Sequence, residues 1–421
     1  MKKKIINFIQ ILKSINFLNS FKISSCDVLF FNHDADRAVT LNGKAYSPLI
    51  DSVREDFEAR GFVCSSVALP WSVLTGNKAY GSPLNINKFI FFEFVFAFLF
   101  KNDIQKKYKQ NSVYKRILEL ANPKLIISIG CPEKLCIEAR EKKIFHVEIL
   151  HGIGYTSIPW GWSYKSSEFL PQGILALDAI SHNTFKPLVN LGIEIKIIPH
   201  PFLKRFLTKD IDKIPLEWLP KKNNIIKWEK EILISLQWAY AGDHESYVEY
   251  ENILENGLFY KEIEQIIKEN RNILFRFRFH PVQLKNQKYK FLIEFMDDFV
   301  NKHPNTEWKE SSFLPYPSIV RSCAGNISMS SMSCYDAAAF GVSSLMLCPT
   351  INSGGIYEDW FVDLEEEGYL QKSKANFDLI KSWVASVKKQ EPRISNLDDN
   401  QSWDIAFKWM IDSSNLIIQN S

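Results

Sequence analysis

A serine-rich stretch in the last quarter of the chain carries side chains suited to binding an anion. It runs Asn326-Ile-Ser-Met-Ser-Ser-Met-Ser-Cys-Tyr-Asp-Ala-Ala-Ala-Phe-Gly341 and changes from a strand-like to a helical pattern. Ser333, followed three residues later by Asp336, predicts a capping box and a helix that begins at Ser333. The hydroxyls of Ser330, Ser331 and Ser333, with nearby backbone N–H groups and the helix dipole, would converge on one anion. The alternative is that these serines only cap the helix.

A second set of polar groups ends a predicted strand upstream of that stretch. Residues 272–279 alternate aromatic residues with Arg276 and Arg278, and His280-Pro281 follows. Arg278 and His280 could hold a phosphate from a second side, and Asp336 could accept hydrogen bonds from ribose hydroxyls. Because Arg276 and Arg278 share one strand face, we expect one of them to be structural.

The first half of the chain has polar residues at two predicted strand ends. Asp34 and Asp36 follow the strand 26–32, and His151 follows the strand 145–150. Polar groups just past the carboxyl ends of parallel strands lie where open α/β sheets bind ligands. The alternative for His151 is an ordinary loop histidine.

An irregular segment after His151 is rich in aromatic residues. It includes Tyr155 and Trp160, and Glu168 is the only carboxylate between residues 156 and 172. Long irregular loops in compact domains are usually functional, and indole faces suit sugar rings. We therefore expect sugar or acceptor contacts here, with a solvated loop charge as the alternative for Glu168.

Several common cofactor sites have no sequence signal. No Gly-x-Gly-x-x-Gly follows the first strand, no Walker sequence occurs, and no strand ends in paired Asp residues for Mg²⁺. Cys131 and Cys136 have no partner pair of Cys or His nearby, so zinc is not expected. The seven scattered cysteines indicate reduced thiols in a cytoplasm. The simplest account is a metal-independent nucleotide site with no cofactor.

The elements that must position these residues alternate between strand and helix. Buried-strand patterns occur at 26–32, 62–68, 124–129, 145–150, 173–177, 195–198, 231–236, 272–279 and 342–348, with helical patterns between most of them. This alternation predicts an α/β protein of two doubly wound, Rossmann-like domains facing across a cleft. The predicted parts are a domain at 1–206, a linker at 207–230, a domain at 231–390 and a helical segment at 391–421 that packs back on the first domain.

Length and composition agree with two globular domains. The chain has 421 residues, 46% hydrophobic and 24% charged, with a net charge of +3 that is too small to argue for nucleic acid. Lys13 interrupts the apolar N-terminus and no cleavage site follows, so export is not expected. A basic amphipathic first helix at an anionic membrane surface is the alternative. Residues 89–100 are too few to cross a bilayer, which needs about 20.

Several longer stretches resemble one enzyme family. Arg-Phe-His-Pro, the serine-rich stretch and a His-Gly at a strand end are similar to bacterial GT-B glycosyltransferases that use CMP-activated acidic sugars. Asn-His-Asp-Ala-Asp-Arg, Lys-Ala-Tyr-Ser-Pro-Leu-Ile-Asp-Ser-Val-Arg-Glu-Asp-Phe-Glu and Leu-Thr-Gly-Asn-Lys-Ala-Tyr-Gly resemble the retaining β-Kdo transferase module of the WbbB type. This resemblance covers essentially the whole chain.

The resemblance implies a reaction, a donor and an acceptor. It implies transfer of Kdo from CMP-β-Kdo, with retention, to a lipid-linked glycan of lipopolysaccharide O-antigen or capsule, at the cytoplasmic face of the inner membrane. Retention by double displacement needs a carboxylate nucleophile, and Asp243 matches that position. Glu168 would act as acid/base or orient the acceptor, and His280 would contact the phosphate or the carboxylate of the sugar.

Three alternatives remain at this point. The first is an inverting transferase of the CMP-sialic-acid type with Asp34 or Asp36 as general base. The second is a CDP-glycerol glycerophosphotransferase, which shares the His-Gly and His-Pro pattern. The third is a non-catalytic glycan-binding protein on a GT-B fold.

Overall fold

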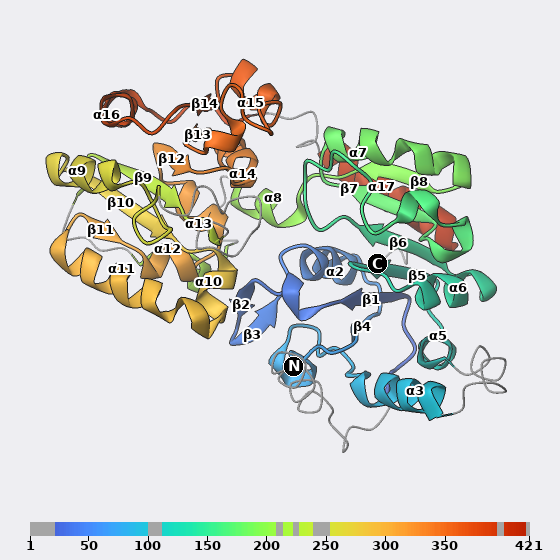
Figure 1. The fold of residues 1–421 in the computed structure, drawn as a ribbon. Coiled ribbons are helices and arrows are strands. Elements are labelled where there is room, and N and C mark those ends of the chain that lie inside the picture. The colour runs from blue at the N-terminus through green and yellow to red at the C-terminus, as the bar shows by residue number, and fades with distance from the viewer. Residues whose placement is uncertain are drawn as a thin grey trace. The chain divides into compact units, whose positions relative to one another are not determined.

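The computed structural model describes residues 22–99, 112–207, 214–221, 227–238, 253–393 and 400–417. The chain divides into two compact units. The first comprises residues 1–204 together with 396–421, and the second comprises residues 205–395. Each unit is built on a six-stranded parallel sheet, as the α/β alternation predicted (Figure 1).

The first sheet has the strand order β4-β1-β5-β6-β7-β8. Its strands are β1 (Val28–Asn32), β4 (Cys64–Ala68), β5 (Leu125–Ser128), β6 (Phe145–Ile149), β7 (Gly173–Ala176) and β8 (Glu194–Ile197). Numbered along the chain, the order is 2-1-3-4-5-6, so the direction of winding reverses between β1 and β5. In doubly wound sheets, ligands bind outside the carboxyl ends of the strands at such a reversal.

The second sheet has the strand order β11-β10-β9-β12-β13-β14. Its strands are β9 (Lys230–Ser235), β10 (Ile273–Arg278), β11 (Thr306–Glu307), β12 (Gly325–Ser328), β13 (Ser343–Met346) and β14 (Leu370–Lys372). Numbered along the chain, the order is 3-2-1-4-5-6, the order of dinucleotide-binding Rossmann sheets. Its reversal point lies between β9 and β12, next to the predicted anion-binding residues.

Helices cover both faces of the sheets. They are α2 (Ile50–Ala59), α3 (Asn87–Leu99), α5 (Val113–Ala121), α6 (Glu133–Glu141), α7 (Ala179–Phe185), α8 (Pro201–Leu207), α9 (Lys261–Glu269), α10 (Pro281–Lys285), α11 (Lys290–Lys302), α12 (Lys309–Phe313), α13 (Tyr316–Val320), α14 (Ser333–Ala339), α15 (Val362–Glu366), α16 (Phe377–Ser386) and α17 (Asn400–Ser414). Among the described residues, no helix is both long and apolar enough to span a lipid bilayer.

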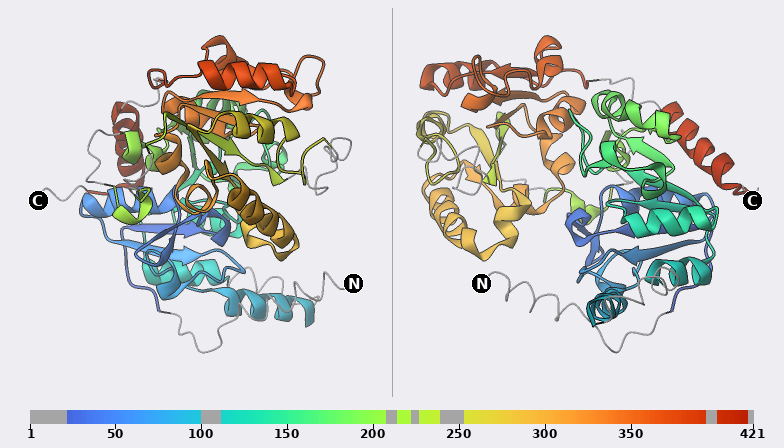
Figure 2. Two further views of the ribbon diagram at one scale, coloured as in Figure 1. Left: turned by 90° about the vertical axis from the view of Figure 1, so that its left-hand side faces the viewer. Right: turned by 45° about the vertical axis from the view of Figure 1, so that its right-hand side comes forward.

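The last helix, α17, completes the core of the first unit. Trp403, Phe407 and Met410 pack with α2 and with alternate residues of β1, β5, β6 and β7. Helices α5 and α6 cover the opposite face of this sheet. Figure 2 shows α17, in red, lying along the first unit although more than 180 residues separate it from β8. Burial of its aromatic side chains provides the hydrophobic energy that holds it there.

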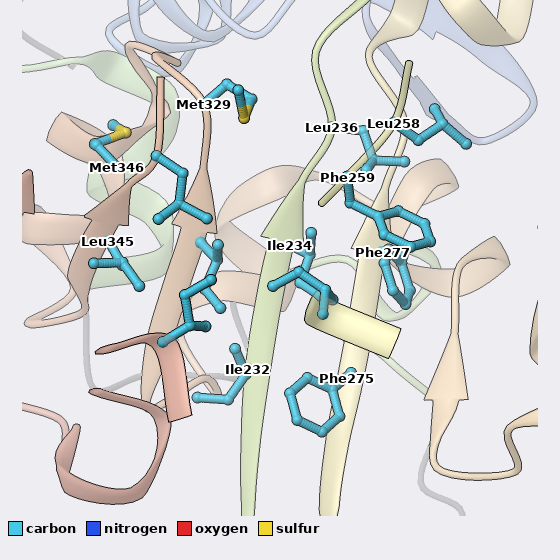
Figure 3. Packing of buried hydrophobic residues seen from close by; sticks show 14 of the residues in the cluster. Ile232, Ile234, Leu236, Leu258, Phe259, Phe275, Phe277, Met329, Leu345 and Met346 are labelled. Atoms are coloured by element: carbon cyan, nitrogen blue, oxygen red, sulfur yellow. The ribbon is translucent and has the colours of Figure 1, made fainter. Parts of the chain in front are cut away.

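The two faces of the second sheet differ in polarity. On one face, Ile232, Ile234, Phe275 and Phe277 pack with helices α9, α11 and α16 in a continuous apolar core (Figure 3). The opposite face carries the alternating Arg276, which is 7% exposed and forms ion pairs with three carboxylates. The partners of Arg276 are Glu231, Glu307 and Glu310, at 2.6, 2.8 and 3.1 Å. Arg276 is therefore structural.

A short antiparallel hairpin was not predicted from the sequence. It pairs β2 (Val39–Leu41) with β3 (Lys44–Tyr46) around Asn42-Gly43, and both turn residues have positive φ. Asn-Gly is the usual sequence of such a tight turn. Arg37 fastens the hairpin to α2, because its guanidinium pairs with Asp51 at 2.7 Å and donates to the carbonyl of Ala45.

Candidate functional site at the strand ends

The second unit gathers polar side chains at the carboxyl ends of its three central strands. Ser235 of β9 is paired with Arg278 of β10 on one side and with Ser328 of β12 on the other, so the three strands end level. The segments that follow these strands carry Gln237, His280, Ser330, Ser331 and Ser333, here called the strand-end cluster. It lies at the reversal point between β9 and β12, where ligands bind in this class of sheet.

Gln237 links the two sides of that reversal point. Its amide oxygen accepts from the N–H of Ser330 at 3.0 Å, and its amide nitrogen lies 3.2 Å from the Ser330 hydroxyl. Ser330 is 4% exposed, whereas Ser331 and Ser333 are half-buried. Ser330 is thus held by Gln237, and the more accessible hydroxyls belong to Ser331 and Ser333. The position of Gln237 directly after a buried strand was the signal that could have identified it.

The predicted capping box at Ser333 is wrong. Helix α14 begins at Ser333 as expected, but its N-cap is Met332 and no side chain caps it. Instead, the Ser331 hydroxyl accepts from the N–H of Ser333 at 3.2 Å, which is the N–H that the Asp336 carboxylate was expected to bind. With seven residues α14 is under two turns long, so its dipole is weak. An anion at this end of the helix would therefore be held mainly by hydrogen-bond donors.

His280 is oriented as a hydrogen-bond donor. It is the N-cap of α10, and its Nδ1 accepts from the N–H of Val282 at 3.2 Å. Burial and the nearby Arg278 lower the pKa of His280, so the ring is neutral at pH 7. A neutral imidazole whose Nδ1 accepts must carry its proton on Nε2. The remaining N–H can therefore be donated to a ligand.

Arg278 is engaged with the protein more than the sequence indicated. It donates to the backbone carbonyls of Ser311 and Leu314, the second at 2.8 Å, and lies 5.5 Å from the ring centre of Tyr316. The Tyr316 hydroxyl in turn donates to the carbonyl of Ser333 at 3.0 Å. Arg278 thus shapes the loop beside the strand-end cluster while remaining half-buried.

The side-chain carboxyl group of Asp336 has a raised pKa. Burial raises its pKa to about 7, against the attraction of Arg278. Its side chain is half-buried in the first turns of α14. A carboxyl group with a pKa near 7 can accept or donate a hydrogen bond at neutral pH, which suits a ribose contact.

The first unit brings three of the predicted acceptor residues together. His151, Tyr155 and Trp160 form an aromatic patch, with ring centres 5.5 Å apart for His151 and Trp160 and 5.9 Å for Tyr155 and Trp160. The Tyr155 hydroxyl lies 3.2 Å from Nε2 of His151. His151 and Trp160 are exposed. Such a surface can stack on a sugar ring.

The other predicted carboxylates of the first unit have different surroundings. Asp34 accepts from the N–H groups of Val73 and Leu74, so its carboxylate holds that loop in place. Asp36 accepts from the N–H of His33, and burial raises its pKa, opposed in part by His151. Glu168 is exposed and lies 3.3 Å from the Ser166 hydroxyl. Asp243 lies outside the described residues.

A second polar cluster in the first unit was not anticipated. Ser128, Cys131, Cys136, His146 and Glu148, here called the thiol cluster, meet between β5, β6 and α6. Ser128 and Glu148 face each other across the paired strands, and the Ser128 hydroxyl donates to Glu148 at 2.5 Å. The signal was the alternation of His146 and Glu148 within an otherwise apolar strand.

Solved structures similar to this chain share its two-domain fold. UDP-GlcNAc 2-epimerase from Neisseria meningitidis, bound to UDP-GlcNAc, is 13% identical, with a TM-score of 0.52 over 91% of this chain and 99% of that one. The S. aureus MnaA–UDP structure is 12% identical, with a TM-score of 0.53 over 94% and 98%. UDP-GlcNAc 2-epimerase from Methanocaldococcus jannaschii is 11% identical, with a TM-score of 0.52 over 91% and 99%. No family model and no curated protein matches the sequence. The chain has the GT-B architecture.

Proposed function

We propose that the chain is a glycosyltransferase that takes its sugar from a nucleotide-activated donor. The observation that carries this proposal is the strand-end cluster at the β9/β12 reversal point of a GT-B fold. Hydroxyls of Ser331 and Ser333 and the Nε2–H of His280 are donors suited to a phosphate, and Asp336 is suited to a ribose. In this proposal these uncharged donors bind the phosphate without a metal ion.

The finer proposal names the donor and the stereochemistry. The donor is CMP-β-Kdo, the acceptor is a lipid-linked glycan, and the anomeric configuration is retained. The support for this finer proposal is the sequence resemblance. The residues that would select the sugar include Asp243, which lies outside the described residues. In this scheme the Asp243 carboxylate attacks the anomeric carbon and CMP leaves. The acceptor hydroxyl then displaces Asp243 and loses its proton to a base, for which Glu168 is the candidate.

A second candidate is epimerisation of a UDP-sugar. Two of the solved structures named above are UDP-GlcNAc 2-epimerases and the third is an MnaA–UDP complex, and each aligns over at least 91% of this chain. The two candidates differ in the nucleotide that the strand-end cluster must accept. Nucleotide preference therefore separates them before any product is analysed.

The first experiment measures the thermal unfolding midpoint with CMP, CDP, UMP and UDP. A ligand that binds only the folded state raises the midpoint by mass action. We expect CMP to raise it most, and His280→Asn to remove the rise while His182→Asn, a histidine on α7 of the first unit, retains it. A preference for UDP would favour the epimerase, and a preference for CDP would favour the glycerophosphotransferase. No shift with any nucleotide would contradict the proposal.

The second experiment tests the finer proposal with CMP-Kdo and a glycan acceptor. We expect release of CMP and a product with the same anomeric configuration as the donor. Asp243→Asn should abolish transfer while CMP still raises the unfolding midpoint. An inverted product would instead favour the sialyltransferase type, and full turnover by the variant would exclude Asp243 as the nucleophile.

A further inference from the structure

The thiol cluster of the first unit has the composition of a metal site. Strand pairing, rather than sequence spacing, brings its members together, since β5, β6 and α6 each contribute. One ligand atom from each of Cys131, His146 and Glu148 lies within 4.8 Å of the other two. Sulfur, imidazole nitrogen and carboxylate oxygen are the ligands that zinc prefers in proteins. Cys131 and His146 are 15 residues apart in the sequence, so no short spacing motif indicates the site.

A second cysteine stands at the distance expected for a shared ion. The Sγ atoms of Cys131 and Cys136 are 3.8 Å apart. Two thiolates bound at about 2.3 Å to one tetrahedral ion would be about 3.8 Å apart. Cys136 is 1% exposed and lies in the second turn of α6. The set of ligand atoms within 4.8 Å of one another does not include its Sγ, so Cys136 would have to move toward the ion to become the fourth ligand.

The hydrogen bonds of the cluster leave one nitrogen lone pair unused. Ser128 donates its single hydroxyl proton to Glu148, when that carboxyl is ionised, and lies 2.7 Å from Nε2 of His146. Nε2 must then be the protonated nitrogen, and it donates to Ser128. Nδ1 keeps its lone pair, and because His146 is 1% exposed this nitrogen is buried, with no hydrogen-bond partner among the described residues. A buried imidazole whose other nitrogen is held by a hydrogen bond matches a metal-binding histidine.

The carboxylate of the cluster forms no ion pair with any of the described residues. Glu148 is 2% exposed and accepts from Ser128 and from the N–H of Gly130, each at 2.5 Å. A cation bound between these side chains would stabilise the ionised carboxylate.

We propose that Cys131, Cys136, His146 through Nδ1 and Glu148 bind one divalent transition-metal ion of the zinc class. Binding displaces the protons of the thiols and of the Glu148 carboxyl. The ion would tie the loop after β5 and the start of α6 to β6, next to the reversal point of the first sheet. Ser128 and the N–H of Gly130 would orient the ligands. This site is separate from the strand-end cluster, so the proposal does not rest on the proposed function.

The test uses the full chain, reduced and freed of metal with a chelator, then titrated with Co²⁺. We expect one Co²⁺ per chain, with the visible bands of a tetrahedral ion and a sulfur-to-cobalt charge-transfer band in the near ultraviolet. Cys131→Ser and His146→Ala should weaken binding by at least tenfold, and Cys136→Ser should halve the charge-transfer intensity. Cys64→Ser, a half-buried thiol outside the cluster, is the matched control and should bind as the unmodified chain does.

A second measurement needs no variant and so does not depend on how variants fold. Zn²⁺ should slow alkylation of Cys131 and Cys136 at least tenfold, read site by site by mass spectrometry, and should leave Cys64 unchanged. Failure to bind Co²⁺ would overturn the proposal, as would a charge-transfer band that keeps its full intensity in Cys131→Ser. Loss of two hydrogens on exposure to air, with a Cys131–Cys136 disulfide and no metal binding under reduction, would identify a redox pair instead.

Discussion

The two sheets place polar residues at the same edge, yet burial gives these residues different uses. In the second unit, His280, Ser331 and Ser333 remain half-buried, and His280 keeps an N–H to donate. In the first unit, Ser128, His146 and Glu148 are at most 2% exposed. Topology thus decides where polar groups gather. Burial decides whether they can meet a soluble substrate or only an ion small enough to be enclosed.

The largest expected effect tests the polar face of the second sheet. Arg276→Ala should lower the free energy of unfolding by about 3–5 kcal/mol, because three carboxylates lose their buried cation. Denaturant unfolding measures the change, and the exposed Arg271→Ala is the control. A loss below about 1 kcal/mol would mean that solvent, rather than Arg276, compensates these carboxylates.

The next effect distinguishes the accessible cluster from the buried one. His280→Asn keeps an N-cap acceptor for Val282 but removes the Nε2–H, so kcat/KM for transfer should fall about 100-fold with little loss of stability. Glu148→Gln, in the buried cluster, should leave the nucleotide-induced rise in unfolding midpoint unchanged. The comparison fails if Glu148→Gln weakens nucleotide binding as strongly as His280→Asn does.

A feature that the two units share gives a smaller effect. A Cβ at Gly173 of β7 would lie 2.4 Å from the Trp409 ring of α17, and a Cβ at Gly325 of β12 would lie 2.5 Å from the Trp383 ring of α16. Each glycine makes room for an indole from the last helix of its unit. Gly173→Ala and Gly325→Ala should each cost about 1–3 kcal/mol through overpacking.

Calorimetry can measure both glycine variants and assign each loss to one unit. Gly152→Ala is the control, since its Cβ would lie 3.7 Å from its nearest neighbour, an ordinary contact. Equal stability of all three variants would show that the helices bearing Trp383 and Trp409 shift without cost.

The smallest effect concerns pH. The folded-state pKa of Asp336 is raised to about 7 from an ordinary value of 3.8, so the folded state holds a proton that the unfolded state releases. Stability from this group is therefore greatest below about pH 4 and is lost as the pH rises through about 7. Between pH 5 and pH 8 the free energy of unfolding should fall by about 1 kcal/mol less in Asp336→Asn than in the unmodified chain, after allowance for solvent screening. An unchanged slope would assign the pH dependence to other groups.

Sequence patterns predicted the fold well because parallel strands are buried on both faces. The apolar runs at 124–129 and 145–150 became β5 and β6 within one or two residues. Short edge strands such as β11 and β14 were missed, since two or three residues give no period. The hairpin β2–β3 was missed although Asn42-Gly43 is its signal.

The candidate site was less predictable because contacts between distant residues decide it. Position after a strand pointed to His280 and Ser330, which do follow β10 and β12 in the structure. It could not show that Gln237 would occupy the Ser330 N–H, or that Arg278 would bond to two backbone carbonyls. It also could not pair Cys131 with His146, which meet only because β5 and β6 are neighbours.

The position of α17 has a consequence for how the protein is made. At about 5–20 residues per second, a ribosome needs about 10–40 s to proceed from β8 to α17. During that interval the second unit, which is continuous in sequence, can fold, while the first sheet lacks the helix that covers Val147, Ile149 and Leu175. The newborn first unit therefore presents an apolar surface to chaperones and to other nascent chains until Trp403 and Phe407 have been synthesised.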